Sequence, residues 1–117
     1  MSIPVELDEV RSVAAGQAPF AYLLTVSDDA SPHAVAITPA IGAGDITFEA
    51  GKRSCANALA RPNVSLLWPP ARSDDYSLIV DGTASVDGST IRIAPARAVR
   101  HRPAPGGGSD CAPVALE

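Results

Sequence analysis

The chain has 117 residues, a net charge of −4 at neutral pH, and 46% hydrophobic against 19% charged residues. This length and composition are typical of one globular domain with a single core, not of a disordered chain. The nine Lys and Arg residues form no long run, which argues against nucleic acid as a partner. No apolar stretch approaches the roughly 20 residues that span a bilayer, and the N-terminus lacks the pattern of a signal peptide. We therefore expect a cytoplasmic protein that does not insert into a membrane.

The two cysteines, Cys55 and Cys111, belong to no CxxC or Cys/His cluster. We therefore expect neither a disulfide framework nor a metal site. Cys55 follows two basic residues, but no His or acid near it in the sequence could act as its base. A small buried residue is the expectation for Cys55, not a nucleophile.

An amphipathic helix and a strand are predicted first. Residues 4–16 have helical apolar spacing that ends at Gly16. Residues 20–27 then alternate in the manner of a strand. This alternation places four large apolar residues on one face: Phe20, Tyr22, Leu24 and Val26.

Two further strands complete a predicted three-stranded meander. Residues 33–41 alternate after a turn, and Pro39 indicates an edge position or a bulge near the end of this strand. A glycine-rich turn at 42–45 leads to a third strand at 46–50. We expect His33, at the start of the second strand, to be exposed.

One helix and three more strands follow. Residues 54–61 are rich in alanine and are stopped by Pro62, which predicts a short helix. The apolar run at 63–68 is typical of a strand buried on both faces. Two long strands, at 76–86 and 89–99, are joined by a turn at Asp87 and Gly88.

Six strands with hairpins on both sides of one helix predict a mainly β domain over residues 1–102. The expected architecture is a six-stranded antiparallel barrel with the short helix between strands 3 and 4. Residues 103–117 are rich in Pro and Gly, and we expect them to be a disordered tail.

The segment between the third strand and this helix is the best candidate for a binding site. Gly51 frees the backbone, Lys52 and Arg53 supply positive charge, and Ser54 can cap the helix that follows. Unpaired N–H groups of a helix N-terminus beside two cations form a ready site for a phosphate. The alternative is that the two cations belong only to a solvated turn.

Three motifs in order carry a family resemblance: Ala-Gly-Lys-Arg-Ser-x-x-Asn-Ala, Arg-Pro-Asn-Val-Ser-Leu-Leu-Trp and Tyr-Ser-Leu-Ile-Val-Asp-Gly-Thr-Ala. At these spacings the chain, over residues 10–102, resembles the pyridoxamine 5′-phosphate oxidase-like split-barrel flavoproteins. The resemblance implies that the barrel is a split β-barrel. It also implies a homodimer that binds FMN, or the deazaflavin cofactor F420, in a cleft between its subunits.

The resemblance also implies which residues contact the cofactor. The basic pair and the Ser54 hydroxyl match a phosphate, whereas Thr38 would offer a hydroxyl beside the flavin ring. Asn57 would face the same pocket or the dimer seam, unless it only satisfies a local backbone group. Trp68 would stack on a ring or close the cleft, unless it anchors the core or an interface. The expected cofactor-binding residues are therefore Lys52, Arg53, Ser54, Asn57, Thr38 and Trp68.

The sequence offers no acid–base pair or nucleophile constellation, so no catalytic residue is assigned. A flavin-type cofactor carries hydride chemistry itself, and the protein mainly positions its ring. The chain has no convincing match to the C-terminal substrate site of full pyridoxamine phosphate oxidases, which disfavours vitamin B6 oxidation. We expect a flavin- or deazaflavin-dependent oxidoreductase acting on a small-molecule acceptor. The alternative is a non-catalytic binding protein on the same scaffold that sequesters flavin, haem or another planar ligand.

Overall fold

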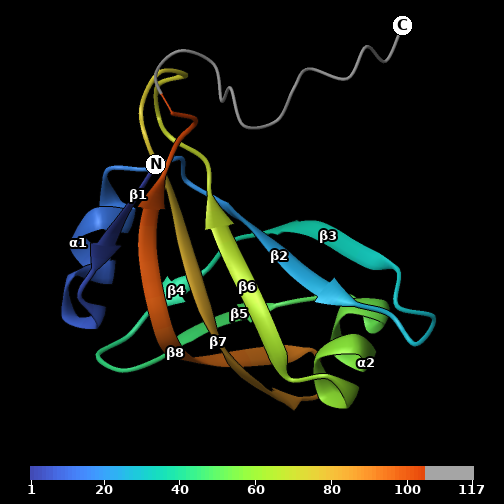
Figure 1. The fold of residues 1–117 in the computed structure, drawn as a ribbon. Helices are drawn as coiled ribbons and strands as arrows, with labels where there is room; N and C mark the ends of the chain where they lie inside the picture. The colour runs from blue at the N-terminus through green and yellow to red at the C-terminus, as the bar shows by residue number, and fades with distance from the viewer. Residues whose placement is uncertain (105–117) are drawn as a thin grey trace, which may run out of the picture.

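Antiparallel strands make up most of the computed structural model, which describes residues 1–104 (Figure 1). The predicted disordered tail therefore lies almost wholly outside the described residues. In chain order the elements are β1 (Ser2–Val5), η1 (Leu7–Glu9), α1 (Val10–Ala15), β2 (Ala21–Val26), β3 (Pro32–Ile37), β4 (Ala40–Ile41), β5 (Ile46–Glu49), α2 (Lys52–Ala60), β6 (Asn63–Trp68), β7 (Ser77–Asp87) and β8 (Thr90–His101).

The sheet curls back on itself. Its path runs β3-β2-β6-β7-β8-β5-β4, with β1 paired to β8 beside this path. The strands at the two ends of the path, β3 and β4, are consecutive in the chain and are separated only by Thr38 and Pro39. The result is a barrel with a split between β3 and β5 (Figure 1). This architecture confirms the predicted antiparallel split β-barrel, with α2 as its short helix.

The strand count differs from the prediction, because the sheet has eight strands and not six. Pro39 interrupts the predicted second strand and leaves β3 and β4 as separate elements, since proline cannot donate to a ladder. The predicted meander is therefore only partly formed. The β5 strand pairs with β4 over two residues and with the distant β8 over four.

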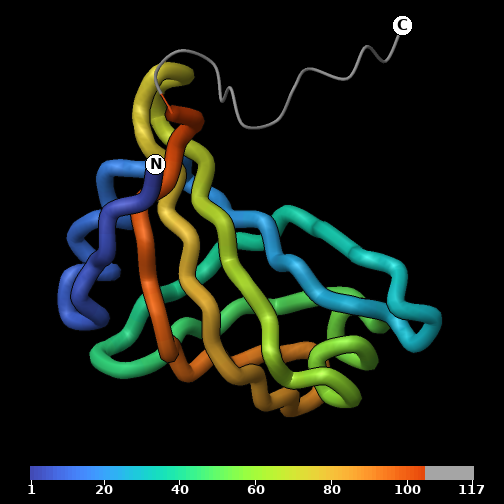
Figure 2. The backbone as a smooth tube through the Cα atoms, viewed as in Figure 1, coloured from blue at the N-terminus to red at the C-terminus, as the bar shows by residue number. Residues whose placement is uncertain are grey.

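The predicted helix over 4–16 is wrong in its first half. Ser2–Val5 forms β1, in which Ser2 pairs with His101 and Val5 with Ala98. Figure 2 shows the chain start lying beside the end of β8. The β5 strand pairs only with the first part of β8, so the later part offers free backbone groups that β1 satisfies.

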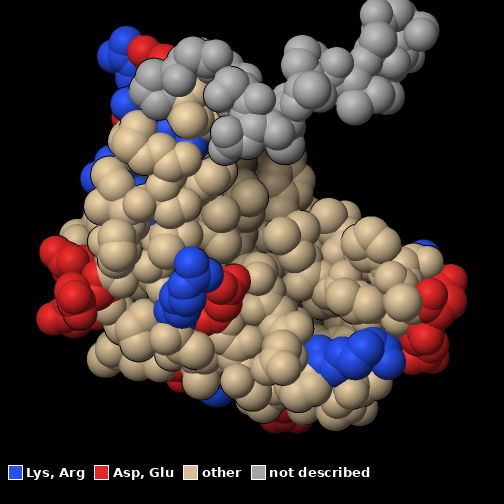
Figure 3. Space-filling model, viewed as in Figure 1, with Lys and Arg blue, Asp and Glu red and all other residues tan. Residues whose placement is uncertain are grey.

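The alternation predicted for β2 is present, but its large apolar residues face outwards. Tyr22, Leu24 and Val26 are 39%, 37% and 40% exposed, whereas Leu23 between them is fully buried. Figure 3 shows that the face formed by β2 and β6 is mostly free of charged side chains. The outside of the barrel therefore carries an apolar surface, which is unusual for the exposed face of a sheet.

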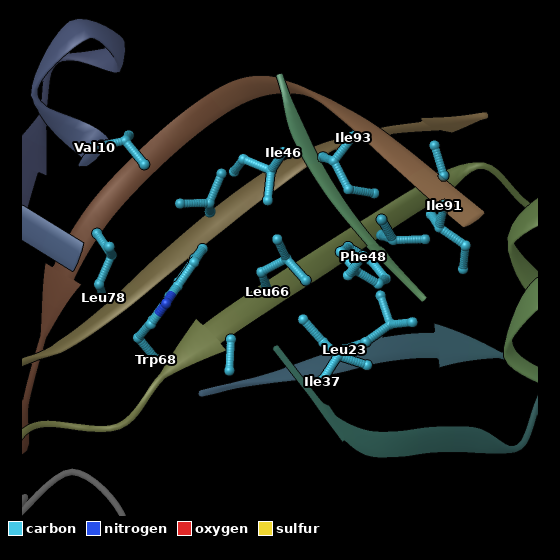
Figure 4. Close-up of a cluster of buried hydrophobic side chains, with 14 of the residues drawn as sticks. Val10, Leu23, Ile37, Ile46, Phe48, Leu66, Trp68, Leu78, Ile91 and Ile93 are labelled. Atoms are coloured by element: carbon cyan, nitrogen blue, oxygen red, sulfur yellow. The ribbon is translucent and has the colours of Figure 1, made fainter. Parts of the chain in front are cut away.

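The core fills the inside of the barrel (Figure 4). Every strand of the path except β4 places a buried apolar side chain there, and α1 adds Val10. Trp68, at the end of β6, is 3% exposed. The fully buried large side chains are Leu23, Ile46, Leu66, Leu78, Val80, Ile91 and Ile93.

The long β7–β8 hairpin is bent by a bulge between Asp81 and Gly82. A Cβ atom added at Gly82 would lie 2.6 Å from the backbone oxygen of Ala94 and 2.6 Å from Cγ2 of Ile93. The two strands approach this closely only because Gly82 has no side chain.

We expect Gly82→Ala to lower the free energy of unfolding by about 1–3 kcal/mol, because the added methyl group overpacks a rigid backbone contact. Urea denaturation followed by circular dichroism measures the loss. Gly44→Ala is the matched control, since nothing lies within 4 Å of a Cβ at Gly44. Equal stability of the two variants would contradict this account of the bulge.

Candidate anion-binding groove

The split in the barrel forms a groove of about 600 Å³. One wall is β3, and the other is the end of β5 with the first turn of α2. Because β3 ends the sheet path, the backbone N–H and C=O groups on its second edge are not used by any strand of the described residues. The lining residues are His33, Val35, Ala36, Ile37, Glu49, Ala50, Gly51, Lys52, Arg53, Ser54 and Ser89.

Helix α2 begins at Lys52, two residues earlier than predicted. Gly51, in an extended conformation, is the N-cap, and no side chain among residues 1–104 caps the helix. The prediction that Ser54 caps the helix is therefore wrong, because Ser54 lies inside the first turn and is 2% exposed. The N–H groups of this first turn are free of a side-chain cap at the edge of the groove, where they attract negative charge.

Two cations border the groove beside this helix start. Lys52 and Arg53 are exposed, and within residues 1–104 neither forms an ion pair with a carboxylate. The Arg53 guanidinium donates one hydrogen bond from Nη2 to Oγ of Ser27, at 3.3 Å, and has further N–H donors. Unpaired cations at an uncapped helix N-terminus favour an anionic ligand.

One acid also lies on the groove. The carboxylate of Glu49 accepts hydrogen bonds from Oγ of Ser89, at 2.6 Å, and Oγ1 of Thr90, at 2.5 Å. The bond from Ser89, and then that from Thr90, lowers the pKa of Glu49. Both carboxylate oxygens are therefore engaged with the β7–β8 turn, and this contact joins β5 to the hairpin below the groove.

A lowered pKa in the folded state means that Glu49 stabilises the fold above its unfolded pKa and loses this effect as the pH falls through its folded pKa. We expect Glu49→Gln to be less stable than the wild type at pH 7 and to approach it near pH 3. Urea denaturation at both pH values measures the difference. Asp87→Asn, which replaces a carboxylate by its amide in the same hairpin, is the control for the loss of one negative charge. A stability gap that is the same at both pH values would contradict the role of the Glu49 carboxylate.

Asn57 fastens α2 to the β2–β3 hairpin. Its side chain is 5% exposed, and Nδ2 donates to Oγ1 of Thr25, at 3.1 Å, and to Oγ of Ser27, at 3.3 Å. The amide is thus satisfied by side chains of β2 and the following turn and is not among the groove-lining residues. The expected contact of Asn57 with a cofactor stays a prediction.

Side-chain contacts also join the end of the β2–β3 hairpin to α2. The β2 strand pairs with β6 only from Tyr22 to Leu24, so the rest of the hairpin extends past β6. At the end of α2, Arg61 donates to the backbone oxygen of Val26, at 2.7 Å, and pairs with Asp28, also at 2.7 Å. Helix α2 therefore holds the end of β2 and the following turn through side-chain hydrogen bonds, and β3 is attached to β2 by its own ladder.

The remaining two expected cofactor residues do not line the groove. Thr38 is exposed in the link between β3 and β4, directly after Ile37, which does line it. Trp68 is buried in the core. Their contacts with a cofactor stay predictions, and the burial of Trp68 favours the core alternative.

His33 is a groove residue that sequence reasoning missed. The expectation that it is exposed is wrong, because the residue is half-buried and its Nδ1 atom is fully buried. In β3 the inward row is His33, Val35 and Ile37, so extending the apolar alternation two residues upstream would have found it.

Cys55 lies in α2 behind the groove and packs against the core. Burial, and then the nearby charge of Glu49, raises the pKa of its thiol. A raised pKa keeps the thiol protonated and unreactive at neutral pH.

Within the described part of the chain, no helix has the length and apolar character needed to cross a membrane. No protein-family model matches the sequence. Two uncharacterized proteins, of Mycobacterium bovis and Mycobacterium tuberculosis, are each 38% identical to the chain, over 74% of its length and 72% of theirs.

Solved structures share the fold at lower identity. A candidate pyridoxamine 5′-phosphate oxidase of Listeria innocua has a TM-score of 0.66 and 20% identity, over 81% of this chain and 98% of its own. An FAD-binding protein of Mycobacterium smegmatis has a TM-score of 0.64 and 17% identity, over 87% and 100%. An F420 reductase has a TM-score of 0.59 and 15% identity, over 80% and 94%.

The curled sheet, the split and the helix beside it give the chain the split-barrel fold of these pyridoxamine 5′-phosphate oxidase-like and flavin-related structures. By sequence the chain belongs to one family with the two mycobacterial proteins.

Proposed function

We propose that the protein is a cytoplasmic flavin- or deazaflavin-dependent oxidoreductase that acts on a small-molecule acceptor. FMN is the preferred cofactor, and F420 is the alternative. The observation that carries the proposal is the pair of unpaired cations, Lys52 and Arg53, on the uncapped first turn of α2 in the barrel split. Proteins named for FAD binding and for F420 reduction share this fold, which supports a cofactor of this type.

The groove residues fit the parts of such a cofactor. Lys52 and Arg53 would hold the phosphate, together with the first N–H groups of α2. The free backbone groups on the edge of β3 would form hydrogen bonds with the polar ribityl chain of the cofactor. Val35 and Ile37 would offer apolar surface to its flat ring. When bound, the cofactor supplies the hydride transfer. The protein then contributes binding and orientation, which agrees with the lack of an assigned acid or base.

The proposal includes a homodimer. The apolar outer surface of β2 adjoins a second groove of about 810 Å³, which Leu24, Val26 and Ala34 help to line. This outer groove meets the split groove at His33, because His33 lines both. A second copy over the outer face would bury this apolar surface and border the cofactor. Sedimentation equilibrium should give twice the 11.9 kDa chain mass, and a monomer would refute this part of the proposal.

Titration of the apo protein with FMN and with F420, followed by fluorescence, tests the cofactor. We expect roughly micromolar binding of at least one of them. Reduction of the bound cofactor by a nicotinamide or deazaflavin donor then tests the enzyme. Binding without reduction by any such donor would reject the oxidoreductase and favour the alternative, a non-catalytic protein that sequesters a planar ligand. Binding of neither cofactor would reject the proposed function altogether.

A further inference from the structure

His33 stands between the two grooves of the molecule. It lies on β3 opposite Thr25 of β2, in the inward row that also contains Val35. The other wall of the split groove carries Lys52 and Arg53, and its remaining charge is Glu49. The wall opposite His33 therefore carries two cations and one carboxylate, whose two oxygens each accept a hydrogen bond from a hydroxyl of the β7–β8 turn.

The two ring nitrogens of His33 have different surroundings. Nδ1 is buried, and no described residue offers it a hydrogen-bond partner. An unpaired N–H group and an unpaired lone pair are both unfavourable at this buried atom, so Nδ1 alone does not fix the position of the ring proton. Nε2 is not among the buried unpaired atoms and is therefore the ring nitrogen that a bound molecule can reach. An anionic oxygen at Nε2 would hold the ring proton there, because such an oxygen can only accept a hydrogen bond.

We propose that His33 donates a hydrogen bond from Nε2–H to an anionic oxygen, of the phosphate class, bound in the split groove. The inference rests on the proposed function in so far as that function places a phosphate there. Charge favours the split groove over the outer one, because the split groove is lined by two cations and one carboxylate, Glu49, whereas the one charged residue among the outer groove's described lining is Asp81, which pairs with Arg97. His33 would thus hold the anion from the β3 wall while Lys52 and Arg53 hold it from α2.

The first experiment uses the wild-type chain labelled with ¹⁵N at histidine and inorganic phosphate as the probe. We expect ring-nitrogen spectra to show the Nε2–H tautomer of His33 and a shift of its Nε2 signal on phosphate addition. His101 is the internal reference, because its Nδ1 lies 2.9 Å from Oγ of Ser2 on β1, away from the groove. A proton on Nδ1 in the presence of phosphate, or an Nε2 signal that phosphate leaves unmoved, overturns the proposal.

Two variants make the test position-specific. Glutamine places an amide nitrogen near the site of Nε2, whereas asparagine places one near Nδ1. We expect His33→Gln to keep most of the FMN affinity and His33→Asn to lose roughly tenfold or more, with riboflavin, which lacks the phosphate, bound equally by both. Equal FMN affinity of the two variants, or an equal loss for riboflavin, overturns the proposal.

The results separate this inference from the proposed function. A phosphate-dependent shift at His33 in a protein that binds neither FMN nor F420 supports the anion contact and rejects the flavin enzyme. Flavin binding with no difference between the two variants supports the flavin proposal and rejects the role of His33.

Discussion

The double variant Lys52→Ala/Arg53→Ala is expected to lose FMN affinity by far more than tenfold. Each hydrogen bond to a charged group contributes about 1.5–3 kcal/mol, so each lost cation weakens binding by roughly 10- to 100-fold. The effect should be specific to the phosphate, because both side chains lie at the start of α2, where the proposed function places the phosphate and not the ring. Fluorescence titration of wild type and variant with FMN measures it.

Two controls isolate the charge effect. Riboflavin lacks the phosphate, so its affinity should be the same for the wild type and the double variant. Arg72→Ala removes a cation of the β6–β7 loop whose side chain is 81% exposed and is not part of the groove, so it should leave FMN binding unchanged. Unchanged FMN affinity in the double variant would count directly against a phosphate site at α2.

Replacement of Trp68 by alanine is expected to cost about 3–5 kcal/mol of unfolding free energy, because it empties a large site in the core. A loss of this size is a substantial part of the total stability of a small domain, about 5–15 kcal/mol. Trp68→Phe should cost less, since it keeps a buried ring. Trp68 is the single tryptophan of the chain, so urea denaturation is followed by circular dichroism and not by fluorescence.

The same variants distinguish a role of Trp68 in the core from a role in cofactor binding. If Trp68 only fills the core, Trp68→Phe should bind FMN with the wild-type affinity. A stable alanine variant with much weaker FMN binding would reverse this interpretation and assign Trp68 to the cofactor.

The strands were predictable wherever apolar alternation or a turn marks them locally, as at the Gly88 turn between β7 and β8. Strand partners were not predictable in this way. Ser2 pairs with a residue 99 positions later, and β5 pairs with β8 across the helix and two strands. Such pairings depend on which edges remain free after the sheet curls, and no local pattern in the sequence carries that information.

The candidate site, too, could be predicted only in part. Lys52 and Arg53 were predicted because adjacent residues supply both the charge and the helix start. The position of β3 opposite α2 could not be predicted, because the two elements are brought together only when the sheet curls. Asn57 illustrates the limit, because its partners Thr25 and Ser27 lie about 30 residues earlier in the chain. A polar residue in a small helix gives no indication of which distant hydroxyls it satisfies.

The side-chain attachment of the β2–β3 hairpin makes ligand binding and wall position parts of one equilibrium. Arg53 belongs both to this attachment, through Ser27, and to the proposed phosphate site. An anion held by Arg53 would therefore be connected through one guanidinium to the turn that leads from β2 into β3, the strand that bears His33. Where Arg53 keeps both contacts, linkage makes them reciprocal, so the anion stabilises this turn to the same degree as the turn strengthens anion binding. Occupation of the proposed site and the order of the hairpin end would then report the same free energy.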